Sequence, residues 1–386
     1  MFKKILCVLM AVAMVACLFS ACGDNSNSGK TDATTFKIGS IGPTTGGAAI
    51  YGQAVMNAAQ LAVDEINAAG GINGYKVEFK PADDEHDAVK SVNAYNDLKD
   101  WGMQILMGTV TSAPCIAVVE ETHNDNMFML TPSGSAVDCI KYDNAFRVCF
   151  SDPNQGVASA AYIASQKLGT KVAVIYDSSD AYSTGIYEKF IAEAKVKNLN
   201  VVSQAAFTAD SKTDFKVQLQ QAKSAGADLL FLPIYYQEAS LILAQADQMG
   251  YKPAVFGVDG MDGILTLENF NTKLAEGVML LTPFAADAQD DLTKKFVSAY
   301  QAKYNEVPNQ FAADAYDGIY IIKAAIEKAN ATPDMSVSDL CNAIKGVMTQ
   351  ITFDGVTGLQ MTWGADGEPN KAPKGMVIKN GAYVAM

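Results

Sequence analysis

The sequence predicts an α/β protein made of two doubly wound parallel-sheet lobes. The chain has 386 residues, enough for two or three domains of about 100–200 residues each. From residue 36 onward, short apolar strands alternate with amphipathic helices, a pattern typical of parallel sheets covered on both faces. These strand–helix units are too numerous for one doubly wound sheet, so we place a seam between two lobes near residues 148–153.

The first lobe begins with a strand and a long helix. In that helix the apolar residues recur at helical spacing on one face, and Gly70-Gly71 ends it because glycine adopts the left-handed C-terminal conformation without steric cost. Asp87 is placed to cap a later helix. The predicted strands cover 36–41, 75–81, 104–107 and 127–131, and the predicted helices cover 51–69, 87–99 and 113–124.

The same alternation resumes after residue 150. The predicted strands cover 171–176, 200–206, 228–233 and 254–257, and the predicted helices cover 155–168, 183–197, 212–224 and 237–249. Two further helices, at 289–304 and 311–329, follow this second set of strands. The tail from residue 351 contains short strands separated by glycine turns.

Composition and charge narrow the classes of function. Apolar residues make up 49% and charged residues 18% of the chain, as in folded globular proteins. The 42 acidic residues outnumber the 29 basic ones, for a net charge of -13, so nucleic acid and anionic membrane faces would repel the protein. We therefore expect no nucleic-acid partner.

The N-terminus has the features of a secretory signal. Lys3 and Lys4 precede an uncharged apolar run over 5–19, and Ser20-Ala21-Cys22 follows it. This segment resembles a bacterial lipoprotein signal, in which Cys22 is lipidated after removal of residues 1–21. An ordinary cleaved signal and a membrane-spanning anchor remain alternatives. Residues 22–35, rich in Asn, Ser, Gly and Thr, are interpreted as a flexible tether.

Polar residues follow the predicted strands of the first lobe, where ligands of open parallel sheets bind. Ser112 follows strand 104–107 at a predicted N-cap, so its hydroxyl and the free amide groups of the first helical turn suit a carboxylate. Ser133 and Ser135 follow strand 127–131 in a loop of small residues. A plain helix cap and an ordinary loop are the alternative interpretations.

The second lobe presents different chemistry at the same sheet edge. Tyr182 follows strand 171–176, Tyr235 follows strand 228–233, and Asp259 follows strand 254–257. One lobe thus offers amide groups that bind an anion, and the other offers a carboxylate. This combination suits a zwitterionic ligand.

Enzyme, metal and cofactor signatures are missing from the sequence. No nucleophile–base pair or dinucleotide-binding glycine motif is present, so we expect a protein that is not an enzyme. His86 and His123 have no neighbouring Cys or His ligands and are interpreted as solvated surface residues, so no metal and no cofactor are predicted. Buried thiols are favoured for Cys115, Cys139, Cys149 and Cys341; a Cys139–Cys149 disulfide is left open.

From about residue 35 to the C-terminus, the chain resembles the branched-chain amino-acid (leucine/isoleucine/valine)-binding proteins of ABC transporters, which are type I periplasmic binding proteins. The segments that carry this resemblance are Lys37-Ile38-Gly39, Gly42 to Gly46, Tyr51-Gly52, Asp64 to Gly74, Asp83-Asp84, Gly108 to Ser112 and Thr131-Pro132-Ser133. Within them, the Asn-Ala-Ala-Gly-Gly-Ile-Asn-Gly run at 67–74 is highly specific to this group.

The resemblance implies two lobes joined by three hinge crossovers, with the ligand clamped between them. The crossovers are expected near 148–153, 280–285 and 351–357. The first lobe then takes 36–150 and 284–352, including both late helices, and the second takes 151–283 and 353–386.

The resemblance also assigns roles to residues. Ser112 matches the serine that binds the ligand carboxylate, the Ser133 carbonyl binds the ammonium, and Ser135 contacts both charged groups. Asp259 stands where family members carry Glu or Asp to pair with the ammonium. The aromatic walls are matched by Tyr51, Tyr182 and Tyr235.

The function that this resemblance implies is capture of an amino acid outside the cytoplasm and its delivery to an ABC permease. The protein is expected to be a monomer held at the membrane by lipidated Cys22. No Lys or Arg lies at these strand ends, which favours leucine, isoleucine or valine. Because loop 46–49 (Gly46-Gly47-Ala48-Ala49) is small, a larger apolar or aromatic amino acid is the alternative. A ligand-sensing receptor domain is a further alternative, disfavoured because no membrane span follows before Met386.

Overall fold

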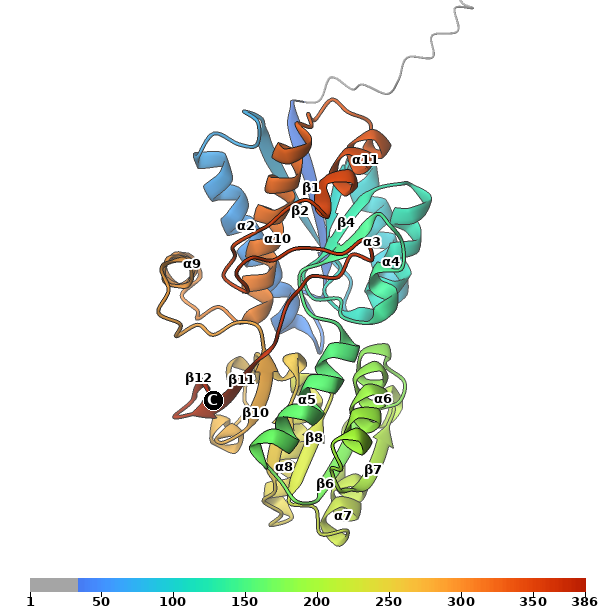
Figure 1. Cartoon of the computed structure of the whole chain (residues 1–386), viewed down its shortest axis with the longest axis vertical. Helices are drawn as coiled ribbons and strands as arrows, with labels where there is room; N and C mark the ends of the chain where they lie inside the picture. The colour runs from blue at the N-terminus through green and yellow to red at the C-terminus, as the bar shows by residue number, and fades with distance from the viewer. Residues whose placement is uncertain (1–33) are drawn as a thin grey trace, which may run out of the picture.

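The computed structural model describes residues 34–386, which form two α/β lobes stacked along the long axis of the molecule (Figure 1). A five-stranded parallel sheet lies in the first lobe and a seven-stranded sheet in the second. The predicted fold class is therefore confirmed. The predicted signal peptide, Cys22 and most of the tether lie outside the described residues.

The first lobe has strand order β2-β1-β3-β4-β5, and all its strands are parallel. Helices α2 and α10 pack together on one face of this sheet, and α3 and α4 pack together on the other. The strands are β1 Thr35–Gly42, β2 Lys76–Asp83, β3 Ile105–Met107, β4 Phe128–Thr131 and β5 Ala145–Arg147. The helices are α2 Ala49–Ala68, α3 Ala88–Asp100, α4 Ser112–Asn124, η1 Val137–Ile140, α9 Asp291–Tyr304, α10 Gln310–Ala329 and α11 Val337–Met348.

The second lobe has strand order β12-β11-β10-β9-β8-β6-β7. Its five parallel strands repeat the order of the first lobe, and β11 and β12 extend the sheet in antiparallel fashion. The strands are β6 Val172–Asp177, β7 Val201–Phe207, β8 Leu229–Leu232, β9 Ala254–Gly257, β10 Met279–Thr282, β11 Lys374–Lys379 and β12 Ala382–Ala385. The helices are α5 Asp152–Gln166, α6 Ala181–Val196, η2 Ala209–Ser211, α7 Lys216–Ser224, α8 Tyr236–Gln248, η3 Asp259–Met261, η4 Ile264–Thr266 and η5 Thr272–Ala275.

Local signals in the sequence explain where helices begin and end. Asp87 accepts hydrogen bonds from the amide groups of Val89 and Lys90, so it caps α3 as predicted. Gly71, just after α2, has a φ of +87°, and a Cβ atom there would lie 2.0 Å from the carbonyl oxygen of Tyr75. Only glycine fits at this position.

The chain passes between the lobes three times: after β5, after β10 and before β11. The third passage comes later than the expected 351–357. Residues 353–371, which the sequence analysis assigned to the second lobe, run along the first lobe before the chain enters β11 (Figure 1). Buried polar contacts hold them there: the carboxylate of Asp317 accepts from the Thr357 amide, and Trp363 donates its indole N–H to the Arg147 carbonyl at 2.8 Å.

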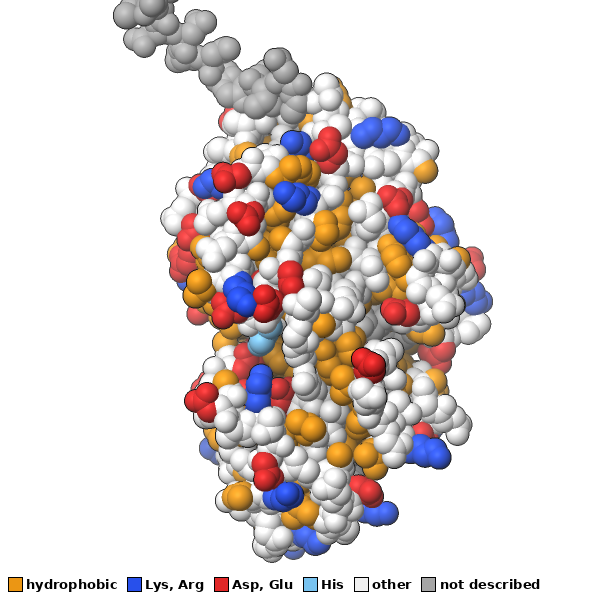
Figure 2. All heavy atoms as spheres, turned by 180° about the vertical axis from the view of Figure 1, so that it is seen from behind, with side chains coloured by type: hydrophobic (Ala, Val, Ile, Leu, Met, Phe, Trp, Pro, Cys, Tyr) orange, Lys and Arg blue, Asp and Glu red, His pale blue; other side chains and the backbone are white. Residues whose placement is uncertain are grey.

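One apolar core continues from the first lobe into the second, because residues of α2 and α10 pack against residues of η3, η4 and α8. The four cysteines within residues 34–386 are buried and carry free thiols. None of the described helices has the length and hydropathy that a membrane span requires. Figure 2 shows one face of the molecule, on which acidic and basic side chains are interspersed.

Candidate functional site

One cavity between the lobes brings together every binding residue predicted from the sequence. Its walls include Tyr51, Ser112, Ser133, Ser135, Tyr182, Tyr235 and Asp259, together with Val110, Thr111, Gly260 and Phe311. The space between these side chains is about 220 Å³, part of which is open to solvent.

The first-lobe wall of the cavity is formed by the segments that follow β3 and β4. Ser112 is the first residue of α4, and Thr111 rather than Ser112 occupies the N-cap position. The Ser112 hydroxyl instead accepts a hydrogen bond from the Ala136 amide at 3.2 Å, which ties the two segments together. Amide groups in the first turn of a helix have no partner within the helix, so they are suited to an anionic group in the cavity.

Side-chain hydrogen bonds fix the 131–135 loop against the neighbouring segment. The Ser133 hydroxyl donates to the Val110 carbonyl at 2.7 Å, and the Thr131 hydroxyl donates to the Thr109 carbonyl at 2.6 Å. Because the Ser133 hydroxyl is used in this way, its side chain holds the loop in place.

Asp259 supplies the charge of the second-lobe wall. Its side chain is buried, and Oδ1 accepts a hydrogen bond from the Tyr182 hydroxyl at 2.6 Å. Burial raises the pKa of Asp259 to about 7, although the hydrogen bond from Tyr182 counteracts this in part. A cation in the cavity would stabilise the carboxylate form of Asp259.

Aromatic rings form the remaining walls. Tyr182 and Tyr235 stack with ring centroids 4.6 Å apart, and Tyr51 packs against Phe311 at 4.2 Å. Tyr51 comes from α2 in the first lobe, yet its hydroxyl donates to the Gly260 carbonyl in the second lobe. The lobes are therefore in direct contact beside the cavity.

Comparisons with known proteins agree with this geometry. The model of the periplasmic binding protein family matches residues 35–382.

The chain belongs to this family.

A Leu/Ile/Val-binding protein homolog from Brucella melitensis is 32% identical over 300 residues, covering 77% of this chain and 80% of the relative. Among solved structures, the branched-chain amino acid transporter substrate-binding protein LivJ from Streptococcus pneumoniae, in complex with isoleucine, is 30% identical with a TM-score of 0.83, covering 91% of this chain and 98% of that one. The leucine-binding protein LivK from Thermotoga maritima is 26% identical with a TM-score of 0.82 at the same coverage. Periplasmic binding proteins bind solutes and are not enzymes.

Sequence reasoning missed two polar residues behind the cavity of this periplasmic binding protein. Asp152, the first residue of α5, is buried, and neither of its carboxylate oxygens has a hydrogen-bond partner among residues 34–386. Gln155 accepts from the Asp259 amide, while its own Nε2 is likewise unpartnered among those residues. Buried polar groups are rarely left unsatisfied, so a polar group that reaches these atoms would find hydrogen-bond partners.

His86 lies nearer the cavity than the sequence suggested. It was interpreted as a solvated surface residue, but it is half-buried, its Nδ1 is 2.9 Å from the Thr111 hydroxyl, and its ring meets Tyr235 edge-on. Burial lowers the pKa of His86 to about 4, so the ring is neutral at pH 7. No group of His, Cys, Asp and Glu within the described chain is arranged to hold a metal ion.

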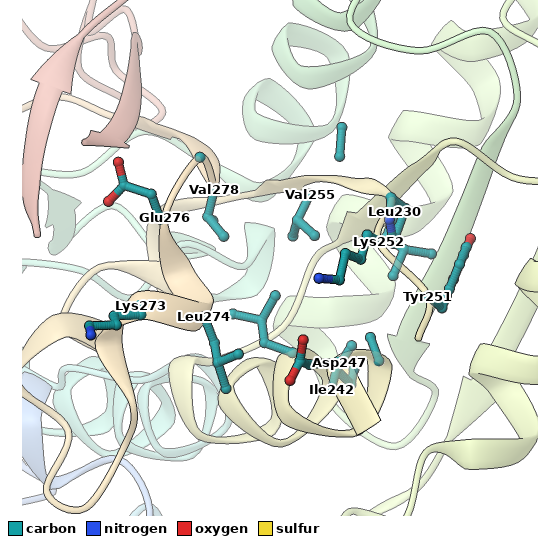
Figure 3. A pocket seen from close by; sticks show the side chains of 15 residues that line it. Leu230, Ile242, Asp247, Tyr251, Lys252, Val255, Lys273, Leu274, Glu276 and Val278 are labelled. Carbon is teal, nitrogen blue, oxygen red and sulfur yellow. The ribbon is translucent and has the colours of Figure 1, made fainter. Parts of the chain in front are cut away.

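A second cavity, of about 1040 Å³, lies at the opposite end of the second lobe (Figure 3). Leu230, Val255 and Val278 line it near the amino ends of β8, β9 and β10, and charged residues such as Lys252 and Glu276 surround its apolar floor. Ligands of open parallel sheets bind at the carboxyl ends of the strands. The cavity between the lobes is therefore the candidate site of this periplasmic binding protein.

Proposed function

We propose that this periplasmic binding protein captures an α-amino acid outside the cytoplasm, encloses it between its lobes and delivers it to the permease of an ABC transporter. The observation that carries this proposal is the opposite chemistry of the two cavity walls. Helix amides and the Ser112 segment lie on one side, and the buried carboxylate of Asp259 lies on the other.

An α-amino acid matches both walls at once. Its carboxylate would accept hydrogen bonds from Ser112 and the amides of the first turn of α4. Its ammonium would bind Asp259, the Ser133 carbonyl and Ser135. Burial of two opposite charges is favourable only when both are hydrogen-bonded, and this arrangement supplies partners for each.

The lining favours an apolar side chain on the ligand. No Lys, Arg or Glu occurs among the described residues that line the cavity, whereas Tyr51, Tyr182, Tyr235 and Phe311 surround it. The Brucella melitensis relative is named for leucine, isoleucine and valine, and the Streptococcus pneumoniae protein is in complex with isoleucine. We therefore propose a branched-chain amino acid as the ligand. A larger apolar or aromatic amino acid is the alternative, because loop 46–49 carries only small residues.

The proposed anchor is a lipid on Cys22, which would hold a monomeric protein at the outer side of the cell membrane. Only the sequence supports this anchor: a positively charged N-terminal region, an apolar run and small residues precede Cys22. Residues 22–35 would then act as the tether between the lipid and the first lobe.

Calorimetric titration with all twenty amino acids tests the ligand. We expect leucine, isoleucine or valine to bind most tightly, and a hundredfold excess over Kd to stabilise the protein by about 2.7 kcal/mol. The ligand should be recovered unchanged, since no turnover is expected. Tighter binding of glutamate or arginine would contradict the apolar specificity, and binding of no amino acid would contradict the proposed function.

A further inference from the structure

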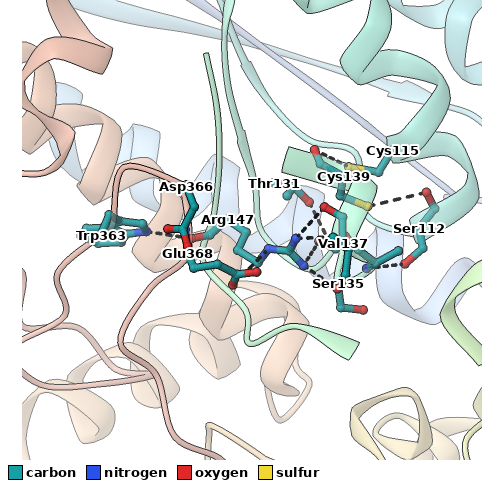
Figure 4. Close-up of polar contacts among 12 residues, drawn as sticks. Ser112, Cys115, Thr131, Ser135, Val137, Cys139, Arg147, Trp363, Asp366 and Glu368 are labelled. Carbon is teal, nitrogen blue, oxygen red and sulfur yellow. Dashed lines mark hydrogen bonds and ion pairs between the residues drawn. The ribbon is translucent and has the colours of Figure 1, made fainter. Parts of the chain in front are cut away.

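Arg147 is a fully buried cation directly behind the candidate site. It is the last residue of β5, immediately before the first passage between the lobes. Its guanidinium group donates hydrogen bonds to four consecutive carbonyl groups of the loop that continues from Ser133 (Figure 4). These acceptors are the carbonyls of Gly134 at 3.2 Å, Ser135 at 2.5 Å, Ala136 at 2.9 Å and Val137 at 3.4 Å.

The other side of Arg147 contacts the segment that leads to the third passage between the lobes. The Arg147 amide donates to the Gly367 carbonyl at 3.2 Å, and the Arg147 carbonyl accepts from the Trp363 indole at 2.8 Å. Its Nε lies 3.5 Å from the carboxylate of Glu368 (Figure 4). One residue therefore joins the loop of the binding site to a late segment more than 200 positions away in the sequence.

We infer that Arg147 is a positioning residue for ligand binding and that Glu368 holds its guanidinium group in place. Four loop carbonyls point at Arg147, so the backbone from 134 to 137 is fixed while Ser133 and Ser135 line the cavity. Glu368 supplies the negative charge that a buried guanidinium requires. The inference rests on the proposed function, because it assigns this loop to the bound amino acid.

A lysine cannot replace Arg147 in this role. Lysine carries a compact point charge with three donors on one nitrogen, whereas arginine presents its donors from several nitrogens in a planar fork. Four consecutive carbonyl groups require donors that are spread over several nitrogens. Arg147→Lys keeps the positive charge, but we expect it to leave some of the four loop carbonyls without a donor and so to loosen the loop.

The test compares two carboxylates of similar exposure. Glu368→Gln removes the charge next to Arg147, and the Glu368 side chain is 30% exposed. Asp125→Asn removes the partner of Lys99 elsewhere in the first lobe, and the Asp125 side chain is 28% exposed. We expect Glu368→Gln to weaken isoleucine binding several-fold by calorimetry, because the guanidinium of Arg147 then loses the negative charge 3.5 Å from its Nε. Asp125→Asn should leave the Kd for isoleucine within about twofold of the wild-type value, even if it lowers the thermal stability as much as Glu368→Gln does.

Hydrogen exchange on the ligand-free protein gives a second measurement that needs no ligand. The Gly134 amide donates to the Thr131 hydroxyl, the Ala136 amide to the Ser112 hydroxyl and the Cys139 amide to the Ala136 carbonyl. We expect them to exchange faster in Glu368→Gln and in Arg147→Lys, and at the wild-type rate in Asp125→Asn. Unchanged exchange and unchanged Kd in both Glu368→Gln and Arg147→Lys would overturn the inference, as would equal acceleration in all three variants. Wild-type protein that binds no amino acid overturns the proposed function instead, and the exchange rates then still decide whether Arg147 holds the loop.

Discussion

The hydroxyl of Tyr51 in the first lobe donates a hydrogen bond to the carbonyl of Gly260 in the second. The same oxygen accepts from the amide of Tyr236, which also belongs to the second lobe, at 3.2 Å. Gly260 follows Asp259 directly, so the contact that joins the lobes adjoins the proposed ammonium site. Closure of the lobes and formation of the site therefore depend on the same few atoms.

Tyr51→Phe should shift the ligand-free protein toward an open arrangement. The substitution removes the hydroxyl and both of its hydrogen bonds between the lobes, each worth about 0.5–1.5 kcal/mol. Small-angle scattering should show a larger radius of gyration, and calorimetry should show weaker ligand binding. Tyr95→Phe is the control, because Tyr95 is also buried but bonds to Asp125 within one lobe. A radius that changes equally in both variants would contradict this prediction.

Asp259→Ala should weaken ligand binding by about 2–5 kcal/mol, because the bound ammonium would be buried without its carboxylate. Calorimetry on the folded variant measures the loss. Asp262→Asn provides a matched comparison: Asp262 is also buried, three residues further on, but does not line the cavity. If Asp262→Asn weakens binding as much as Asp259→Ala, the effect is structural and the assignment of Asp259 fails.

Ligand binding should release protons near pH 6. The pKa of Asp259 is raised to about 7 in the closed protein, above its ordinary value, so between about pH 4 and pH 7 the folded state holds a proton that the unfolded chain has lost. The contribution of this group to stability therefore falls as pH rises through that window. A bound ammonium favours the carboxylate, so capture should expel roughly one proton.

Titrations in two buffers of different ionisation enthalpy count these protons. The binding enthalpy should differ between the buffers for the wild type, and the difference should shrink in Asp259→Asn. Identical enthalpies in both buffers for the wild type would show that Asp259 is already ionised before the ligand arrives.

Lys371→Met should destabilise the protein by about 3–5 kcal/mol, because it leaves a buried carboxylate unpaired. Lys371 donates to Asp314 at 2.7 Å, and the two side chains are 1% and 2% exposed. Urea unfolding measures the loss. Lys323→Met, which breaks an exposed pair with Glu327 on one helix, should cost only a few tenths of a kcal/mol. Similar urea midpoints for the two variants would mean that the Lys371–Asp314 pair contributes little to the free energy of unfolding.

Cys22→Ala should move the protein from the membrane fraction to the soluble fraction of cells that export it. Lipidation requires the thiol, and no described helix has the hydropathy to replace the lipid. Immunoblots of the two fractions decide the matter. A variant that still sediments with membranes would contradict the lipid anchor.

Most of the fold follows from sequence periodicity, and the exceptions have physical causes. β5 was missed, although it is as short as β3, which was predicted. α11 was missed although Ser336 caps it and Leu340, Cys341 and Ile344 fall on one buried face, so a signal was present. The path of 353–371 could not be predicted, since it depends on contacts with Asp314 and Asp317 that are distant in the sequence.

The candidate site was predicted to the extent that its residues follow strands. Ser112, Ser133, Tyr182, Tyr235 and Asp259 all come shortly after the carboxyl end of a parallel strand, and parallel sheets bring those ends together. Phe311 has no such signal, because it lies in the first turn of α10, which only the tertiary fold brings to the cavity. Arg147 ends β5 and Asp152 follows it, so both were overlooked together with that strand.

The two ends of the described chain lie on different bodies: Thr35 begins β1 at the far end of the first lobe, and β12 lies in the second (Figure 1). A hinge motion that closes or opens the lobes would change the separation between these points. A pair of fluorophores, one beside Thr35 and one in the exposed turn at Asn380, would therefore convert amino-acid capture into a change in energy transfer without touching the cavity. The architecture is thus suited to an optical sensor whose reporter groups and recognition site can be altered independently.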